Sequence, residues 1–309
     1  MFVWQRPWIF LLSLWLLTRP ALAAPHAEHV FIISLDGGKP SIMQQSHMPV
    51  VNRLLEEGAH TWTAKTIFPS KTLPSHVSML TGVDPAKHHV LWNDWLPTNG
   101  LVKVPTIFSE AKAADLTTAM FVGKEKFRHL LVPGTVDDFD FNPYQAQTVS
   151  KAVAGEKTMT SEGTVLGNFV AQDAARYIKQ KKPNLCFIHF ADPDSAGHKY
   201  GWGSKEQIQT FADVDAAIGT ILKAISDAGI ARKSALIITA DHGGHERVHG
   251  FNTPDDMNIP WIVWGVGVKH GFEIKAPVVT YDTAATALWL LGVPRPKNFD
   301  GFPVSSAFE

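Results

Sequence analysis

His29-Val-Phe-Ile-Ile-Ser-Leu-Asp36-Gly-Gly38 is an unbroken apolar run of strand length that ends in an acid and two glycines. Such runs are typical of strands buried on both faces of a parallel sheet, because these strands have no solvent-facing side. Similar apolar runs recur at residues 117–122, 185–190, 235–240 and 261–265. The chain is therefore expected to build a mainly parallel sheet.

Helical patterns lie between these runs. The longest helix is expected over residues 204–228, where Ser204 and Gln207 have the spacing of a capping box and Gly229 ends the pattern. Further helices are expected at residues 48–58, 105–114, 161–180 and 282–291. The alternation of strands and helices predicts an α/β fold, in which helices flank a mainly parallel central sheet.

The first 23 residues have the pattern of a secretory signal peptide. Arg6 precedes an apolar run at residues 9–17, and Ala21-Leu22-Ala23 fits a small-x-small cleavage site. The run is shorter than the roughly 20 residues of a membrane span. We expect cleavage after Ala23, no membrane attachment of the mature chain, and a periplasmic or secreted location.

Residues 24–309 are expected to form a single domain. Glycine and acidic residues without a clear period at about 123–162 predict a loop-rich insertion over the functional site, with a surface excursion as the alternative. Cys186 is the only cysteine, so no internal disulfide can form. The formal net charge of −1 argues against binding in a nucleic-acid groove but is compatible with a nucleotide substrate.

Polar residues follow three of the expected strands. Asp36 ends the first, Asp192-Pro-Asp194-Ser-Ala-Gly-His198 follows the run at 185–190, and Asp241-His242 follows the run at 235–240. The carboxyl ends of parallel strands meet at one sheet edge, so these side chains are expected to converge. Carboxylate and imidazole without thiolate favour zinc, manganese or iron over calcium. Each motif alone is also typical of a turn or a solvated loop.

Thr72 lies in the stretch Ile67-Phe-Pro-Ser-Lys-Thr72-Leu-Pro74, after which the pattern becomes helical. A hydroxyl at or just before a helix start, with Pro74 in the first turn, faces free backbone N–H groups and the positive end of the helix dipole. An ordinary N-cap is the alternative interpretation. Together with the acidic strand ends, the position favours Thr72 as a nucleophile.

Six motifs in this order resemble the alkaline phosphatase superfamily, in particular its nucleotide pyrophosphatase/phosphodiesterase branch. They are Ser-Leu-Asp36-Gly, Phe-Pro-Ser-Lys-Thr72-Leu-Pro-Ser-His, Thr-Gly-Val-Asp-Pro-Ala-Lys-His-His-Val-Leu-Trp-Asn93, Asp-Pro-Asp194-Ser-Ala-Gly-His198, Asp241-His242-Gly-Gly and Val-His249-Gly-Phe. The resemblance implies a metallo-phosphoesterase domain with two divalent ions, zinc foremost and manganese as the alternative. The implied ligands are Asp194, His198 and His249 for one ion and Asp36, Asp241 and His242 for the other.

The resemblance also implies roles for residues around Thr72. Thr72 would lie between the ions, and Asn93 with the backbone N–H of Leu73 would hold a non-bridging phosphoryl oxygen. His249 is preferred to His245 because His-Gly-Phe matches the family's His-Gly-aromatic step. Leu73 stands where nucleotide-cleaving members often have an aromatic residue, which leaves nucleotide specificity open.

Two polar residues and a group of aromatic residues near the motifs are expected to have other roles. His76 is expected to be structural and Asp192 to have a supporting role at most. The aromatic residues that either line the pocket or belong to the core are Trp92, Trp95, Phe139, Phe141 and Tyr144.

The implied reaction is in-line attack by the Thr72 alkoxide on a phosphoester, with a phospho-threonine intermediate that is then hydrolysed. A phosphomonoesterase, or a periplasmic protein that binds metal or phosphate without catalysis, are the alternatives. A sulfatase is disfavoured because residues 72–76 lack the Cys/Ser-x-Pro-x-Arg motif. A lipid-head-group phosphotransferase is also disfavoured, because it would be expected to carry several spanning helices, which the sequence does not show.

Charge predicts the class of small-molecule substrate. Three carboxylates carry −3 and two divalent ions +4, and the resulting +1 suits a diester, whereas a monoester dianion would need a further cation. No arginine lies beside the motifs, and Lys71 is expected to point away from the site because neighbouring side chains alternate in extended backbone. Arg247 and Arg128 could reach it from loops. Phosphodiesters and nucleotide pyrophosphates are thus expected to react faster than monoesters, and sulfate esters slowest.

Overall fold

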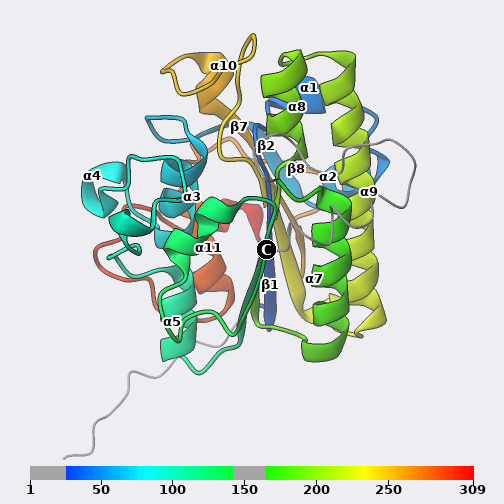
Figure 1. Ribbon diagram of the computed structural model, residues 1–309. Coiled ribbons are helices and arrows are strands. Elements are labelled where there is room, and N and C mark those ends of the chain that lie inside the picture. Colours follow the sequence, from blue (N-terminus) through cyan, green and yellow to red (C-terminus); the bar gives the residue numbers. More distant parts are fainter. Residues whose placement is uncertain (1–25, 142–163) are drawn as a thin grey trace, which may run out of the picture.

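A computed structural model of the chain describes residues 26–141 and 164–309 (Figure 1). These residues form one mixed eight-stranded sheet with the strand order β4-β3-β5-β1-β6-β7-β2-β8. The strands are β1 (His29–Leu35), β2 (Ala59–Lys65), β3 (Thr118–Val122), β4 (Asp138–Asp140), β5 (Leu185–Phe190), β6 (Ser234–Thr239), β7 (Asn258–Gly265) and β8 (Phe272–Glu273).

The predicted mainly parallel sheet is confirmed. β1 is central and pairs in parallel with β5 and with β6, with Ile32 opposite both Phe187 and Ile237. Every residue of β1, β3, β5 and β6 is buried, as expected for strands covered on both faces. Among the described strands, β7 runs antiparallel to its two neighbours β6 and β2.

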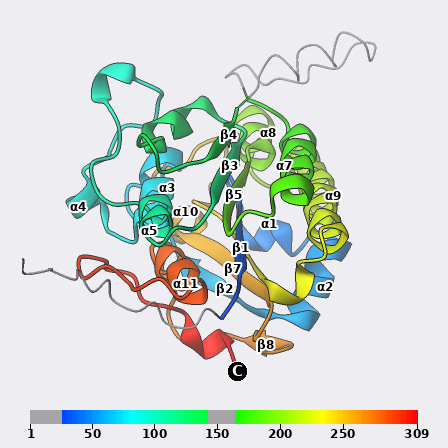
Figure 2. The ribbon, with the colours of Figure 1, turned by 90° about the horizontal axis from the view of Figure 1, so that it is seen from below.

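Helices cover both faces of the sheet and give three layers (Figures 1 and 2). One face carries α1 (Pro40–Met43), α2 (Pro49–Glu57), α7 (Gly167–Lys181), α8 (Asp192–Tyr200) and α9 (Lys205–Asp227). The other carries α3 (Thr72–Thr81), α4 (Pro85–His88), α5 (Ile107–Ala113) and α11 (Asp282–Leu290). The short α10 (Pro254–Met257) precedes β7.

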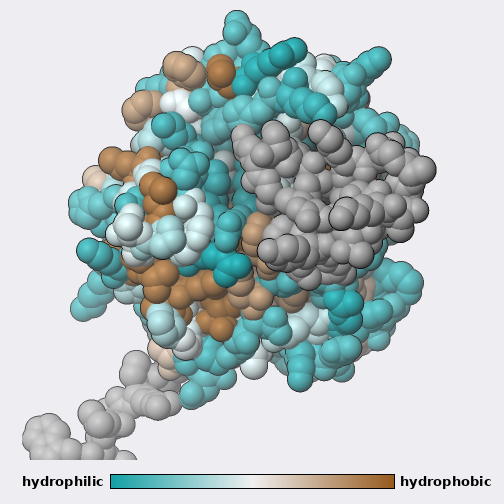
Figure 3. Space-filling view, viewed as in Figure 1, coloured by the Kyte–Doolittle hydropathy of each residue, from teal (hydrophilic) through white to brown (hydrophobic). Residues whose placement is uncertain are grey.

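The alternation of side chains along β1 explains the two hydrophobic cores. Phe31, Ile33 and Leu35 pack with residues of α2, α7 and α9, whereas Val30 and Ile32 pack with residues of α3, α5 and α11. In Figure 3, hydrophilic side chains cover most of the visible described surface, and hydrophobic ones gather at the lower left, over the region of α5 and α11 in Figure 1.

Several elements were not predicted. In β2 the burial alternates instead of being continuous, so this strand lacks the apolar run used to identify the others. α8 contains the Asp192–His198 motif, which locally has the pattern of a turn or a loop but forms a nine-residue helix. Only one of the two bonds of the predicted capping box of α9 is present: Ser204 Oγ accepts from Gln207 N at 3.2 Å. The Gln207 side chain instead accepts from Gly203 N and donates to Pro193 O, and the second bond ties α9 to α8.

The expected insertion at residues 123–162 is only partly described. Residues 125–130 form a 3-10 helix, and β4 pairs with β3 and extends the sheet. Residues 142–163 and the expected signal peptide lie outside the described residues. No described helix is both long and apolar enough to cross a membrane.

Candidate active site

Asp36, Asp241 and His242 meet at the carboxyl edge of the sheet. Asp36 follows β1, and Asp241 and His242 follow the neighbouring strand β6. One ligand atom from each lies within 4.8 Å of the others, and all three residues are buried. His242 Nε2 is 3.4 Å from Asp36 Oδ1 and 3.2 Å from Asp241 Oδ2. We call this group the β1/β6 set.

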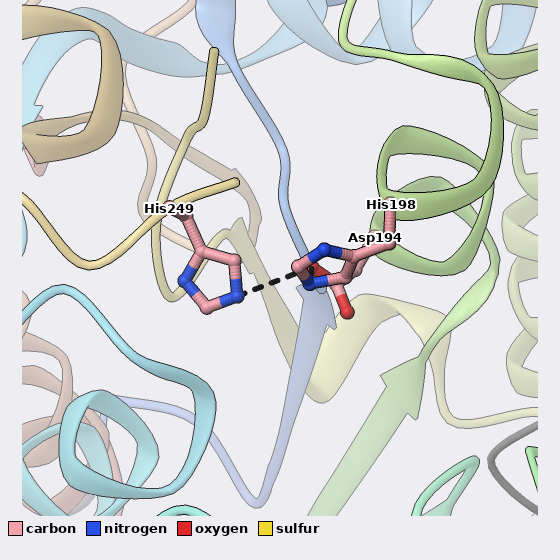
Figure 4. A group of neighbouring side chains, drawn as sticks. All are labelled: Asp194, His198 and His249. Atoms are coloured by element: carbon pink, nitrogen blue, oxygen red, sulfur yellow. Dashed lines mark ion pairs between the residues drawn. The ribbon is translucent and has the colours of Figure 1, made fainter. Parts of the chain in front are cut away.

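Asp194, His198 and His249 form a second group, the α8 set (Figure 4). Asp194 and His198 are four residues apart on α8 and therefore share one face of this helix. His249 comes from the loop between β6 and α10 and points toward them in Figure 4. Asp194 Oδ1 lies 3.3 Å from His198 Nε2 and 3.7 Å from His249 Nε2. The structure thus brings together each implied ligand set, with His249 rather than His245.

Each carboxylate has one oxygen held by the protein and one turned toward histidine nitrogens. Asp36 Oδ2 accepts from His189 Nε2 at 2.9 Å and pairs with Lys124 Nζ at 2.7 Å. Asp241 Oδ1 accepts from two backbone N–H groups, those of Gly37 and His242. Asp194 Oδ1 and Asp241 Oδ2 are buried and make no hydrogen bond within the described chain. Orphaned buried oxygens of this kind are what a bound cation would satisfy.

The three histidines are oriented in the same way. Nδ1 of His198 lies 2.9 Å from the Arg247 carbonyl oxygen, and Nδ1 of His242 lies 2.8 Å from that of Gly243. Nδ1 of His249 lies 2.8 Å from the carbonyl oxygen of Ser70. A carbonyl only accepts, so each Nδ1 carries a proton, and Nε2 is the ring nitrogen through which each histidine would bind a metal ion.

The electrostatics also favour cations at this edge. Asp36, Asp194 and Asp241 are buried together, and Lys124 is the buried cation that contacts two of them. Burial opposes ionisation, but Lys124 holds the pKa of Asp36 and of Asp194 below the usual range. Burial and the two neighbouring carboxylates raise the pKa of Asp241 well above its usual value. Divalent ions would offset this excess of negative charge.

The pKa values of the two histidines of the α8 set are shifted in opposite directions. The Asp194 carboxylate raises the pKa of His198 to about 9, whereas burial lowers that of His249 to about 3 and also lowers that of His242. Carboxylate oxygens with imidazole nitrogens, without thiolate, are a donor set that suits zinc or manganese. The residues present therefore fit two divalent ions.

Thr72 lies beside the β1/β6 set. Its Oγ1 is 3.5 Å from Asp36 Oδ1 and 3.4 Å from His242 Nε2. Thr72 is the first residue of α3, whereas the N-cap is Lys71 without a side-chain cap bond, so the alternative of Thr72 as an ordinary N-cap is wrong. His76 Nδ1 lies 2.7 Å from the Thr72 carbonyl oxygen and its Nε2 2.8 Å from Ser34 Oγ, which agrees with a structural role.

Asn93 and Leu73 contact each other. Leu73 N donates to Asn93 Oδ1 at 2.8 Å, so this N–H is not free for a phosphoryl oxygen, contrary to the expectation that both groups would hold it. The bond leaves the Asn93 Nδ2 donor for a substrate.

A cavity of about 540 Å³ opens over these residues, lined among others by Thr72, Asn93, Asp194, His198 and His249. Trp95 also lines it, whereas Phe139 and Phe141 pack against the core and Tyr144 lies outside the described residues. Lys71 lines the cavity as well, so the expectation that it points away is wrong. The backbone leaves the extended conformation at Thr72, and the alternation rule ends there.

The expectation that the site lacks a further cation is also wrong. Lys124, which follows β3 and is 6% exposed, lies in the site. With it, three carboxylates, two divalent ions and one ammonium sum to +2. Arg128 instead pairs with Glu125, and Arg247 lines a separate surface hollow. Lys124 was not identified from the sequence, because the residues that follow β3 were assigned to the expected insertion at 123–162.

The structure also shows the contacts of three other polar residues around the site. His189, within β5, was not anticipated, because its apolar neighbours hide a polar residue that faces Asp36. His245 pairs with Asp256 at 2.7 Å and belongs to neither ligand set. Asp192 accepts from Gly167 N, and so anchors α8 to the start of α7.

Residues 30–258 match the family model of type I phosphodiesterases / nucleotide pyrophosphatases. The chain belongs to this family. Bis(5'-adenosyl)-triphosphatase ENPP4 of Bos taurus is 24% identical over an alignment of 225 residues, and the alignment covers 69% of this chain and 47% of that protein. The chain therefore spans about half the length of this relative.

Solved structures share the fold. One is murine ectonucleotide pyrophosphatase/phosphodiesterase 5, an inactive threonine-to-alanine variant in complex with AMP, with a TM-score of 0.73 and 14% identity. The superposition covers 91% of this chain and 100% of the murine chain. A 2-O GAG sulfatase has a TM-score of 0.69 and 16% identity, and covers 91% of this chain and 74% of that chain. The alkaline-phosphatase-like fold thus hosts more than one chemistry.

Proposed function

We propose that the protein is an exported two-metal phosphoesterase that hydrolyses phosphodiester or nucleotide pyrophosphate bonds through a covalent phospho-threonine intermediate. The observation that carries this proposal is the position of Thr72 Oγ1, 3.5 Å from Asp36 Oδ1, in a cavity that the α8 set also lines. Family membership supports the reaction class. The signal-like N-terminus supports export.

Zinc is the proposed metal, with manganese as the alternative. Asp194, His198 and His249 would hold one ion, and Asp36, Asp241 and His242 the other. When bound, the ions supply the positive charge that lowers the pKa of the Thr72 hydroxyl and neutralises the phosphoryl oxygens.

The chain's own residues position the reaction. Thr72 Oγ1 gives its proton to solvent and attacks phosphorus in line, the bond from phosphorus to the leaving oxygen breaks, and the leaving oxygen takes up a proton from solvent. Asn93 Nδ2 donates to a non-bridging oxygen, and the N-terminus of α3 favours negative charge beside Thr72. Water then cleaves the phospho-threonine ester, which releases the second product and restores the hydroxyl.

A phosphomonoesterase is the second candidate function, because Lys124 supplies the cation that a monoester dianion needs. With Lys124 counted, charge no longer favours diesters. The preference for diesters rests on the family alone.

The test compares kcat/KM for bis-(p-nitrophenyl) phosphate, p-nitrophenyl phosphate and p-nitrophenyl sulfate, each with zinc and with manganese. We expect the diester to react fastest and the sulfate slowest. A clear preference for the monoester would establish the second function instead. No turnover of any ester by metal-loaded protein would indicate a binding protein without catalysis.

A further inference from the structure

Lys124 joins the two candidate metal sets. Its Nζ lies 2.7 Å from Asp36 Oδ2, in the β1/β6 set, and 2.5 Å from Asp194 Oδ2, in the α8 set. These are the outer oxygens, since Oδ1 of Asp36 and of Asp194 faces Nε2 of the candidate ligands His242 and His198. A single ammonium thus contacts one carboxylate of each set.

The backbone around Lys124 is fixed by its surroundings. Gly123 N donates to the His189 carbonyl oxygen at 3.2 Å, and Gly123 O accepts from Val165 N at 2.9 Å. A Cβ atom at Gly123 would lie 2.9 Å from both Ala191 Cβ and Val165 O, so glycine permits the close approach of the β3 and β5 ends. The Lys124 ammonium is therefore placed by a strand end whose backbone is hydrogen-bonded on both sides.

We infer that Lys124 is a positioning residue that orients both ligand carboxylates, so that the two metal sites form together. Two of its three N–H donors hold the outer oxygens, which turns each Oδ1 toward its own ion site. Without the ammonium, two buried carboxylates would repel each other and lose a fixed orientation. This inference rests on the proposed function only in that the two sets bind metal.

His189 and Lys126 are natural comparisons for Lys124. His189 Nε2 donates to the same Asp36 oxygen but contacts no carboxylate of the α8 set. Lys126, two residues along, lines the same cavity wall and forms no ion pair within the described chain. Replacing a residue that joins the two sets should lower the affinity for both ions. Replacing a residue that holds a single carboxylate should lower the affinity for one ion, and replacing a residue that holds neither carboxylate should leave both affinities unchanged.

The experiment measures zinc binding to the full-length metal-stripped protein by competition with a chromophoric chelator, for wild type, Lys124→Met, His189→Gln and Lys126→Met. We expect Lys124→Met to lower the zinc affinity of both sites by about 10–100-fold, as for other partners of ligating groups. His189→Gln should weaken one ion, and Lys126→Met should leave both within about twofold of wild type, as expected for a side chain without ligand contacts.

Wild-type affinity for both ions in Lys124→Met, or weakening of only one ion, would overturn the inference. If Lys124→Met does not fold by circular dichroism, Lys124→Gln, whose amide can donate to one carboxylate, should weaken the ions unequally, and wild-type affinity for both would again overturn it. Failure of the wild type to bind two ions would instead defeat the proposed function, so the two failures are distinguishable.

Discussion

His249 and Ser70 tie the loop between β6 and α10 to the segment that carries Thr72. His249 Nδ1 lies 2.8 Å from the Ser70 carbonyl oxygen, and Ser70 Oγ donates in turn to the Phe251 carbonyl oxygen at 3.0 Å. Ser70 is two residues before Thr72, so the positions of Thr72 and of the α8 set are linked through short contacts. The proposed nucleophile and the proposed metal ligands therefore share one scaffold.

Thr72→Ala should fold and bind metal like the wild type, because Thr72 contributes no charged ligand and its carbonyl still contacts His76. Turnover should fall by several orders of magnitude, since the nucleophile is lost. Thr72→Ser is the matched control and should retain part of the activity. Near-wild-type turnover in Thr72→Ala, measured as kcat for bis-(p-nitrophenyl) phosphate, would mean that water attacks phosphorus directly.

Asn93→Ala and Asn93→Asp test the proposed donor. Both remove the Nδ2 donor, and kcat should fall by about 10²–10³-fold, as for other donors to a developing oxyanion. Asn93→Asp keeps an acceptor for Leu73 N but adds a negative charge beside the phosphoryl group, so its kcat should be the lower of the two. Equal activity of Asn93→Ala and wild type would remove Asn93 from the mechanism.

Removal of metal should abolish activity and lower the melting temperature. Ions bound only by the folded state stabilise it by about 2.7 kcal/mol per site at one hundred times Kd. The three buried carboxylates also repel one another without the ions, as the raised pKa of Asp241 indicates. Calorimetry with chelator and after zinc addition measures the shift. Full activity in protein shown by elemental analysis to lack transition metals would contradict the two-metal proposal.

His88 should make the metal-free protein less stable in mild acid. Its Nδ1 accepts from Val90 N at 3.0 Å and its Nε2 lies 3.0 Å from Ser78 Oγ, so the folded state requires the neutral ring. Burial lowers its pKa to about 4 from 6.5. Because the folded pKa is the lower one, the stabilisation is complete above about pH 6.5 and is lost as the pH falls toward 4.

The control for this prediction is His88→Asn, which keeps an acceptor for Val90 N but does not titrate. In chelator, the free energy of unfolding of the variant should decline less between pH 7 and pH 4.5 than that of the wild type. Equal declines, measured by denaturant titration at each pH, would show that His88 does not contribute.

The sequence predicted best what depends on local pattern. The buried parallel strands stand out because a short, continuous apolar run is seldom stable where one of its sides faces water, and β5 was predicted with its observed bounds. Their ends placed Asp36, Asp194 and Asp241 at one edge. The alternating strand β2 and the helix α8 were missed, since tertiary packing rather than local pattern determines them.

Long-range contacts determine the rest. The position of Lys124 between Asp36 and Asp194 depends on three strand ends at once, and nothing near Lys124 in sequence indicates it. The same holds for His189, which is hidden in an apolar strand but faces Asp36. The charge argument for diesters omitted Lys124 for this reason, since it counted only cations close to the motifs in sequence.

Thr72 is proposed to form a covalent intermediate during hydrolysis of a phosphodiester. Stereochemistry at phosphorus tests it most directly. A phosphorothioate diester made chiral at phosphorus is hydrolysed in isotopically labelled water, and the configuration of the product is determined by NMR. Two successive in-line displacements predict overall retention of configuration. Inversion would show a single displacement by water and would contradict a phospho-threonine intermediate.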